Sequence, residues 1–148
     1  LVGSEMCIRD SYTTHLLKNV RSSGSGTLEY VYDAEPVETV EMSSENLSAV
    51  LAGMHDLAAD GAVSSYFKDC IVDAAAKTGT IQTGDAKNNN GAFVCFAPYD
   101  DPQIAVAIVI EKGGTGAALA STAVQVLNAY FSNASASSAV TGENALLG

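Results

Sequence analysis

The amino-acid sequence predicts an α+β fold in which an antiparallel sheet is packed between helices. Three strand-like runs follow one another through short, turn-rich connections, and such connections join antiparallel neighbours. One run of apolar residues at helical spacing precedes the strands, and another follows them. The predicted order from residue 43 to residue 131 of the 148-residue chain is therefore helix, three strands, helix.

The segment before the first helix has an extended character. Residues 12–21 show a mixed pattern, and a turn-forming cluster of serine and glycine follows at 22–26. Two strand-like runs at 28–32 and 37–40 flank the segment 33–36. The pattern predicts either a hairpin across 33–36 or a pair of separate extended segments.

The first helix is predicted to start at Ser43 and Ser44, where a hydroxyl group caps the first turn, and Ser44 is interpreted as the cap. Glu45 lies in that first turn, where the positive end of the helix dipole favours a carboxylate. Gly61 is a favourable stop at the other end. The apolar residues between them follow helical spacing: Leu47, Val50, Leu51, Met54 and Leu57.

The three predicted strands cover residues 71–82, 92–98 and 104–110. The polar loop after the first strand ends in Asn90-Gly91, which is a hairpin signal, and a second turn cluster precedes the third strand. The third run is continuous, short and β-branched, so it is predicted to be fully buried.

The C-terminal part is predicted to hold one more helix. The glycine-rich sequence Gly113-Gly-Thr-Gly116 breaks the chain after the last strand, and helical spacing returns from 117 to 131. Residues 132–148 are rich in Ser, Ala and Gly and are predicted to form a flexible tail. The apolar residues of the helix are Ala120, Val124, Leu127 and Phe131.

Charge and cysteine content argue against several functions. The chain has 17 acidic and 7 basic residues, a net charge of −10, and no cluster of Lys or Arg, so nucleic acid is not an expected partner. The three cysteines form no CxxC pair and are odd in number, which predicts neither a zinc site nor a disulfide framework. His15 and His55 lie far apart without cysteine or carboxylate spacing and do not predict a metal site. The longest apolar run, 103–110, is far shorter than the roughly 20 residues of a membrane span.

The first eleven residues form a separate segment. Residues 1–11 resemble a translated sequencing adapter and are predicted to be non-native, so Cys7 and Arg9 carry no chemical argument. The predicted organisation is therefore this segment, one part of a domain at 12–131, and the tail at 132–148.

The most specific motif is Lys77-Thr-Gly-Thr80, which falls inside the first predicted strand. Four residues alone are a weak signal. Together with the Asn-rich loop, the two later strands and the Asp-Asp-Pro turn between those strands, they resemble the C-terminal end of the transpeptidase domain of penicillin-binding proteins. The resemblance covers about residues 12 to 131 and is strongest to the high-molecular-weight, monofunctional type.

The resemblance implies a fragment of the serine transpeptidase/β-lactamase-like fold. That family uses three motifs, Ser-x-x-Lys, Ser-x-Asn and the Lys-Thr-Gly strand, and only the third can be placed here. It implies that Lys77 supplies a positive charge beside the Ser-x-Asn serine, assists proton movement and attracts the substrate carboxylate. Thr78 and Thr80 would offer hydroxyl groups to that carboxylate, and the Thr80 N–H would form half of the oxyanion hole. Gly79 would let an extended substrate approach the backbone closely.

Two other matches are rejected as family motifs. Ser65-Tyr-Phe-Lys68 fits Ser-x-x-Lys and Ser44-Glu-Asn46 fits Ser-x-Asn, but their order is reversed relative to the family. Lys68 also lies only nine residues before the motif lysine. Ser65 is instead predicted to lie in a surface turn before the sheet.

The sequence departs from the family pattern at two places. Ala76 stands where Gly commonly precedes the lysine, and a modest geometric effect is expected because Ala is small. Cys95 also replaces a frequent Gly and is predicted to be a buried apolar residue.

The resemblance implies a parent enzyme, a D,D-transpeptidase that cross-links peptidoglycan by acyl transfer through a serine ester and that β-lactams acylate. Its implied partners are peptidoglycan stem peptides, β-lactams and proteins of the division or elongation machinery, and it implies no cofactor. The parent would act at the extracytoplasmic face of the bacterial cell membrane, held by an anchor that this chain lacks. Without the nucleophilic serine, this chain alone is expected to be inactive.

Two alternatives stay open. One is a non-catalytic binding or structural domain of the same fold. The other is a nucleotide-binding α/β domain that uses the glycines at 113–116 at a helix N-terminus. A parallel pairing of the last two strands would favour the nucleotide-binding domain.

Overall fold

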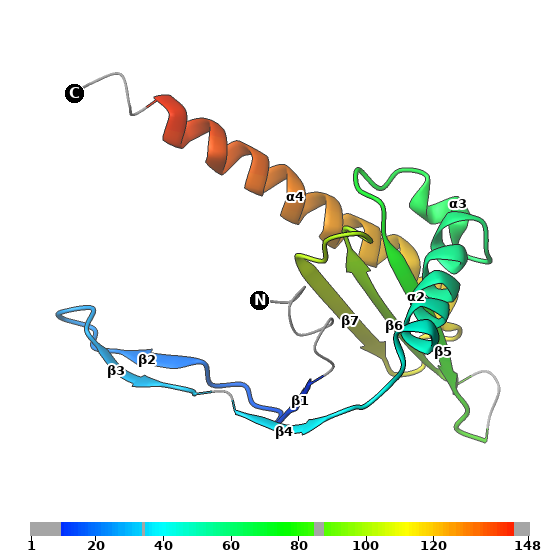
Figure 1. Ribbon diagram of the computed structural model, residues 1–148, viewed down its shortest axis with the longest axis horizontal. Helices are drawn as coiled ribbons and strands as arrows, with labels where there is room; N and C mark the ends of the chain where they lie inside the picture. Colours follow the sequence, from blue (N-terminus) through cyan, green and yellow to red (C-terminus); the bar gives the residue numbers. More distant parts are fainter. Residues whose placement is uncertain (1–9, 34, 85–87, 144–148) are drawn as a thin grey trace.

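The computed structural model of the chain describes residues 10–33, 35–84 and 88–143 (Figure 1). Residues from 43 onward form a sheet with its covering helices. The residues before them form a long ribbon of paired strands that projects away from the sheet (Figure 1).

The sheet consists of β5 (Ala75–Ile81), β6 (Asn90–Ala97) and β7 (Ile104–Ile110), in the order β5-β6-β7. Both neighbouring pairs are antiparallel, with Cys95 opposite Ala76 on one side and opposite Val106 on the other. The predicted pairing in sequence order is confirmed. Because the last two strands are not parallel, the nucleotide-binding alternative is wrong.

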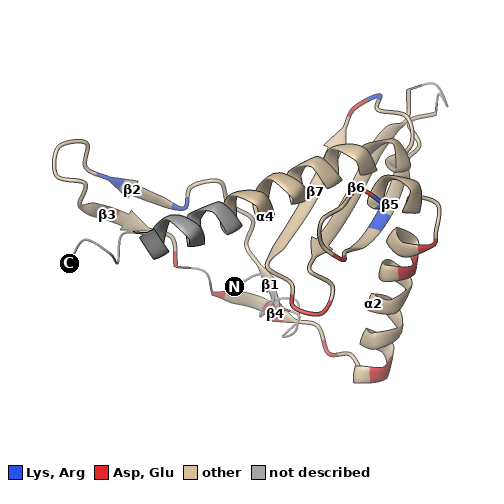
Figure 2. Cartoon of the chain, turned by 90° about the horizontal axis from the view of Figure 1, so that it is seen from above, with Lys and Arg blue, Asp and Glu red and all other residues tan. Residues whose placement is uncertain are grey.

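Helices cover the sheet. The helical elements of the described residues are α2 (Ser44–Ala59), α3 (Ser64–Phe67), the 3₁₀ turn η2 (Gly116–Leu119) and α4 (Ala120–Glu143). Seen in two perpendicular views, α4 crosses one side of the sheet and α2 lies on the other (Figures 1 and 2). The predicted α+β fold, with an antiparallel sheet between helices, is confirmed.

The hydrophobic core joins the sheet to α4. Alternate residues of a strand point to the same face, and Phe93 and Cys95 of β6 are 1% and 2% exposed. The buried stripe of α4 follows helical spacing, as expected for a helix with one face against a sheet. The main buried residues of this cluster are Ala76, Phe93, Cys95, Ala97, Ala120, Ala123 and Leu127.

The prediction that the third strand is fully buried is wrong. No residue of β7 is buried: Ile104, Val106 and Ile108 are half-buried and their neighbours along the strand are exposed. The reason is that, among the described residues, β7 has β6 as its strand neighbour and α4 contacts it on one side of the sheet. A continuous apolar run therefore places one face against the core and leaves the other face open.

The strands on either side of residues 33–36 do not form a hairpin with each other. They are separate extended segments, and each pairs with another strand. β3 (Leu28–Val31) pairs with β2 (Asn19–Arg21), and β4 (Pro36–Thr39) pairs with β1 (Asp10–Tyr12), all antiparallel. The turn lies at the serine and glycine cluster, where the Gly26 N–H donates to the Ser22 carbonyl at 3.0 Å. Gly26 has a φ of +69°, a backbone conformation that residues with a side chain rarely adopt, so this position of the turn favours glycine.

Two helix boundaries differ from the predictions. Ser43, not Ser44, is the N-cap of α2, because the Ser43 hydroxyl accepts from the Asn46 N–H at 3.2 Å. The last helix does not end at Phe131 but continues to Glu143. The residues added between them are mostly alanine and serine with no proline, and alanine favours the helix strongly. Flexibility of this C-terminal segment stays a prediction.

Cys95 is expected to resist alkylation in the folded protein. Burial, and after it the neighbouring Cys70, raises the pKa of the Cys95 thiol to about 11, so little thiolate forms at pH 8. Cys70 is only half-buried, although burial raises its pKa as well. Iodoacetamide at pH 8 should therefore modify Cys70 before Cys95, and mass spectrometry should find Cys95 modified only after denaturation. Equal rates at both thiols would contradict the buried position of Cys95.

Candidate functional site

The four predicted site residues lie in succession on β5, which borders the sheet. Lys77, Thr78, Gly79 and Thr80 stand opposite consecutive residues of β6, from Val94 to Gly91. Within the described part of the chain β5 has one strand neighbour, β6. An extended ligand can pair with the other edge of such a strand through main-chain hydrogen bonds.

Lys77 is an exposed cation on this edge strand. It is the basic residue of β5, where the ribbon is blue in Figure 2. The ammonium group donates to the carbonyl oxygen of Thr78 at 2.6 Å, so it is held close to the strand. The charge therefore lies where an anionic group aligned with β5 would meet it.

The side chains of the motif leave β5 on alternate faces. Lys77 and Gly79 share one face, and Thr78 and Thr80 share the other. The Thr80 hydroxyl oxygen accepts a hydrogen bond from the Gly116 N–H at 3.4 Å, on the side where η2 lies. A ligand that contacts both the lysine and the threonines must therefore lie along the strand edge rather than on one face.

Gly79 leaves a gap in the line of side chains. A Cβ at this position would lie 3.4 Å from the Cβ of Ala92 on β6. Its absence leaves the backbone of β5 without a covering side chain between Lys77 and Ile81. This opening is compatible with close approach of another peptide chain.

The rejected motif matches have structural explanations. Ser65 is exposed on the one-turn helix α3, close to the predicted surface turn. Ser44 is the first residue of α2, next to the capping Ser43. Neither position is on the strand that carries Lys77.

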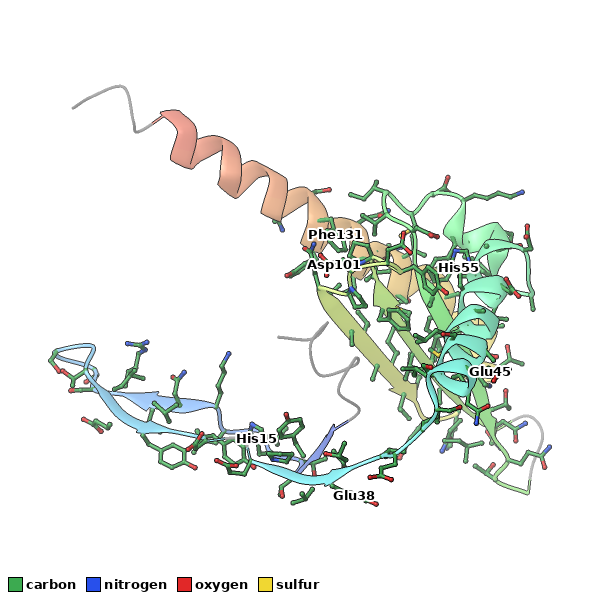
Figure 3. The ribbon with its side chains drawn as sticks, in the orientation of Figure 1. His15, Glu38, Glu45, His55, Asp101 and Phe131 are labelled. Atoms are coloured by element: carbon green, nitrogen blue, oxygen red, sulfur yellow. The ribbon has the colours of Figure 1, made fainter. Side chains whose placement is uncertain are left out.

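The two histidines lie on different parts of the structure, His15 on the ribbon and His55 on α2 (Figure 3). Among the described residues, no group of three or more His, Cys, Asp and Glu side chains is arranged to hold a metal ion. The same described residues include no helix with the length and apolarity needed to span a membrane.

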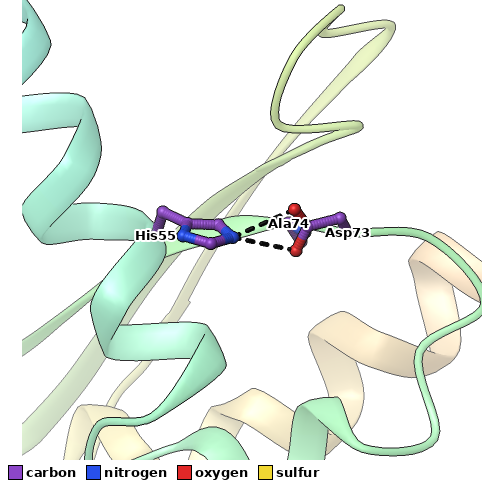
Figure 4. Close-up of polar contacts among 3 residues, drawn as sticks. All are labelled: His55, Asp73 and Ala74. Atoms are coloured by element: carbon purple, nitrogen blue, oxygen red, sulfur yellow. Dashed lines mark hydrogen bonds and ion pairs between the residues drawn. The ribbon is translucent and has the colours of Figure 1, made fainter.

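Sequence reasoning missed an ion pair between α2 and the residue before β5. The His55 Nε2 lies 3.0 Å from both carboxylate oxygens of Asp73 (Figure 4). Two more hydrogen bonds fix Asp73. Its Oδ1 accepts from the Ala74 N–H, and its backbone carbonyl accepts from the Tyr99 N–H, each at 3.0 Å. The His55 ring stacks on Tyr99 with centroids 4.4 Å apart. No local pattern signals this contact, because the two residues are 18 positions apart.

Replacing His55 by alanine is expected to lower the free energy of unfolding by about 1–2 kcal/mol. The ion pair is partly solvent-exposed and contributes up to about 1 kcal/mol, and the ring stack adds about 0.5–1.5 kcal/mol. Urea unfolding followed by circular dichroism measures the change. His55→Phe keeps a ring over Tyr99 and should lose less stability. An alanine variant as stable as the wild type would show that the contact does not hold α2 on the sheet.

An antiparallel sheet between helices with Lys-Thr-Gly-Thr on its edge strand is the arrangement of the penicillin-recognising serine enzymes. The family described as penicillin binding protein transpeptidase domain matches residues 10–131. The chain therefore belongs to the penicillin-binding protein transpeptidase domain family.

Solved structures share the fold of this chain. The chain superimposes on Pseudomonas aeruginosa PBP2 in complex with WCK 5153 with a TM-score of 0.63 and 24% identity, over 86% of this chain and 28% of that one. Penicillin-binding protein 2B from Streptococcus pneumoniae gives a TM-score of 0.66 at 20% identity, over 87% and 23% of the two chains. The identity in these two pairs is low, so they show a shared fold.

Curated relatives carry matching names. The chain is 29% identical to the peptidoglycan D,D-transpeptidase MrdA of Escherichia coli K12, over 77% of this chain and 20% of the relative. It is 32% identical to penicillin-binding protein 2A of Bacillus subtilis, over 64% of this chain and 15% of the relative. The chain thus spans about a fifth or less of the length of these relatives.

Proposed function

We propose that this chain is the part of a peptidoglycan D,D-transpeptidase that carries the Lys-Thr-Gly strand of its active site. The full-length parent would cross-link the stem peptides of peptidoglycan and would be acylated by β-lactams. Family membership and relatives named D,D-transpeptidase support the activity. The observation that carries the site is the position of Lys77–Thr80 on an exposed edge strand.

In the proposed reaction, a serine outside this chain attacks the carbonyl carbon between the last two residues of a stem peptide. Neighbouring basic groups take the serine proton and pass it to the nitrogen of the scissile bond, the terminal residue departs as the amine, and a serine ester remains. An amine of a second stem peptide then attacks the ester, forms the cross-link and releases the serine.

The residues of this chain bind and orient the donor peptide. Lys77 attracts its terminal carboxylate and steadies the proton network of the serine. Thr78 and Thr80 donate hydroxyl hydrogen bonds to the same carboxylate. The Thr80 N–H supplies one of the two donors to the oxyanion, and such a donor is worth about 3 kcal/mol in the transition state. Gly79 lets the peptide lie against the strand.

The proposed location and partners follow from the same relatives. The parent would act at the extracytoplasmic face of the cell membrane, held there by a membrane anchor. Helicobacter pylori PBP2, 25% identical over 62% of this chain and 18% of that one with a TM-score of 0.56, has been solved in complex with MreC. That complex supports a protein of the elongation machinery as a partner of the parent.

Fluorescent penicillin should label the full-length parent but not this chain by itself, because acylation needs the nucleophilic serine. Gel fluorescence and mass spectrometry of both proteins test this prediction. Stoichiometric labelling of this chain at Ser65 would reverse the rejection of that serine. A folded parent that carries Ser-x-x-Lys and Ser-x-Asn but takes no label would instead favour the non-catalytic domain.

A further inference from the structure

The glycine-rich turn between β7 and α4 lies against the candidate site. β5 and β7 run in the same direction, since each is antiparallel to β6. The chain that leaves β7, yellow in Figure 1, is therefore at the end of the sheet where β5 finishes at Thr80 and Ile81. This turn is Gly113-Gly-Thr-Gly116. With the nucleotide-binding alternative rejected, none of the functions considered so far explains these glycines.

Gly116 touches the backbone of the motif strand directly. Gly116 is buried, and a Cβ there would lie 2.3 Å from the Ala92 carbonyl oxygen, 2.4 Å from the Gly79 carbonyl oxygen and 2.7 Å from the Gly79 nitrogen. Gly79 and Ala92 face each other across β5 and β6. The turn therefore packs backbone against backbone on this pair, with no space for any side chain.

The next residue pair is covered in the same way. Gly91 stands opposite Thr80, and a Cβ on Gly91 would lie 3.3 Å from the Thr115 carbonyl oxygen and 3.3 Å from Leu119 Cδ1. Leu119 is 5% exposed and belongs to the core. The turn is thus held against β5 and β6 by a buried side chain of η2.

Hydrogen bonds fix the other end of the turn to the start of β6. The Lys112 N–H donates to Asn90 Oδ1 at 2.9 Å, and the Gly114 N–H donates to the Asn89 carbonyl at 3.0 Å. Gly114 has a φ of +78°, which suits glycine. Both ends being fixed, the position of the Gly116 N–H relative to β5 is determined by the fold.

That N–H donates to the Thr80 hydroxyl oxygen at 3.4 Å. A hydroxyl has one proton and two lone pairs. When the oxygen accepts from Gly116, its own proton points away from the Gly116 nitrogen. The hydroxyl is then prepared to donate to an acceptor at the strand edge.

We propose that the Gly113–Gly116 turn is a positioning element for the transpeptidase site, in which Gly116 orients the Thr80 hydroxyl as a donor to the substrate carboxylate. This inference rests on the proposed function. The turn serves the site through Thr80 and the Gly79 backbone, and it contacts no substrate itself.

The hydrogen bond is tested in this chain without any activity measurement. Amide hydrogen exchange of Gly116, followed by nuclear magnetic resonance, is compared among wild type, Thr80→Ser and Thr80→Val. The serine variant keeps the accepting oxygen and should exchange at the wild-type rate. The valine variant has the same shape without the oxygen, and its Gly116 amide should exchange about fivefold faster, the factor expected for one hydrogen bond. Equal exchange in all three proteins would overturn the proposal.

The effect on the site is tested in the full-length parent. Gly116→Ala should slow the second-order rate of penicillin acylation by at least about tenfold. Gly53→Ala should not, because its new methyl group meets no atom within 4 Å beyond the neighbouring backbone of its own helix. If Gly116 acts through Thr80, Gly116→Ala should reduce the acylation rate by a smaller factor when Thr80 is already alanine. The reduction in that background should be at least about threefold smaller than in the wild type. A merely structural role predicts the same cost in both backgrounds and would contradict the proposal.

The two hypotheses fail in different ways. A wild-type parent that is not acylated at all contradicts the proposed function, and the exchange measurement then still decides whether Gly116 holds Thr80. If Gly116→Ala does not fold, the comparison of Thr80→Ser with Thr80→Val serves in its place. The serine variant should be acylated faster than the valine variant, and equal rates would overturn the proposal.

Discussion

Replacement of Lys77 by alanine in the full-length parent is expected to slow penicillin acylation by at least about tenfold, since each 1.4 kcal/mol corresponds to a factor of ten. The variant loses a charge-assisted contact with the substrate carboxylate, worth on the order of 1.5–3 kcal/mol. The fold should survive, because the lysine side chain is exposed on an edge strand and its ammonium group donates to the carbonyl oxygen of the next residue. The second-order rate of acylation is the measurement, with the melting temperature as the control for folding.

Thr80→Ala is the matched comparison for this prediction. It removes the hydroxyl group but keeps the backbone N–H that is proposed to bind the oxyanion, so it should slow acylation less than Lys77→Ala. A Lys77→Ala protein that stays folded and is acylated at the wild-type rate would remove Lys77 from the site. Strand β5 would then have only a structural role.

Replacement of Phe93 by alanine is expected to lower the free energy of unfolding of this chain by about 3–5 kcal/mol. Phe93 is 1% exposed, lies in the central strand of the sheet, and stacks on Phe67 with ring centroids 6.4 Å apart. Truncation removes a large buried side chain and leaves a cavity between β6 and α4. Urea denaturation followed by circular dichroism gives the change in free energy.

Val94→Ala is the control for Phe93→Ala because the two residues are adjacent and point to opposite faces of β6. Val94 is 43% exposed, so its truncation should cost less than about 1 kcal/mol. Similar losses in the two variants would show that the face toward α4 is not the core of this protein.

Local pattern was sufficient for most of the elements near the site. The helix ending before Gly61, the three strands and their antiparallel order were all predicted, because apolar spacing and turn residues act within a few positions along the chain. The placement of Lys77–Thr80 on a strand was predicted for the same reason and is confirmed. The roles of these four residues stay predictions, because they depend on contacts with a substrate and with the proposed nucleophilic serine.

Contacts between distant residues could not be predicted. The His55–Asp73 ion pair and the packing of Gly116 on Gly79 join residues 18 and 37 positions apart, and nothing in either local sequence marks the partner. The glycines at 113–116 were noticed, but their pattern alone also fits a phosphate-binding turn. Only the close approach of Gly116 to β5 and β6 shows that protein backbone occupies the space beside it.

The sequence by itself determined that this chain forms an antiparallel sheet between helices with a Lys-Thr-Gly-Thr strand. The helices and strands follow from the spacing of apolar residues and from turn residues, and the motif is four consecutive residues. The tertiary structure alone decided which strands of the ribbon pair, that Ser43 caps α2, that α4 continues to Glu143, and that β7 is exposed on one face. The physical reason is that burial and strand pairing depend on which surfaces meet in space. An apolar run such as 104–110 has the same sequence whether one face or both faces are covered.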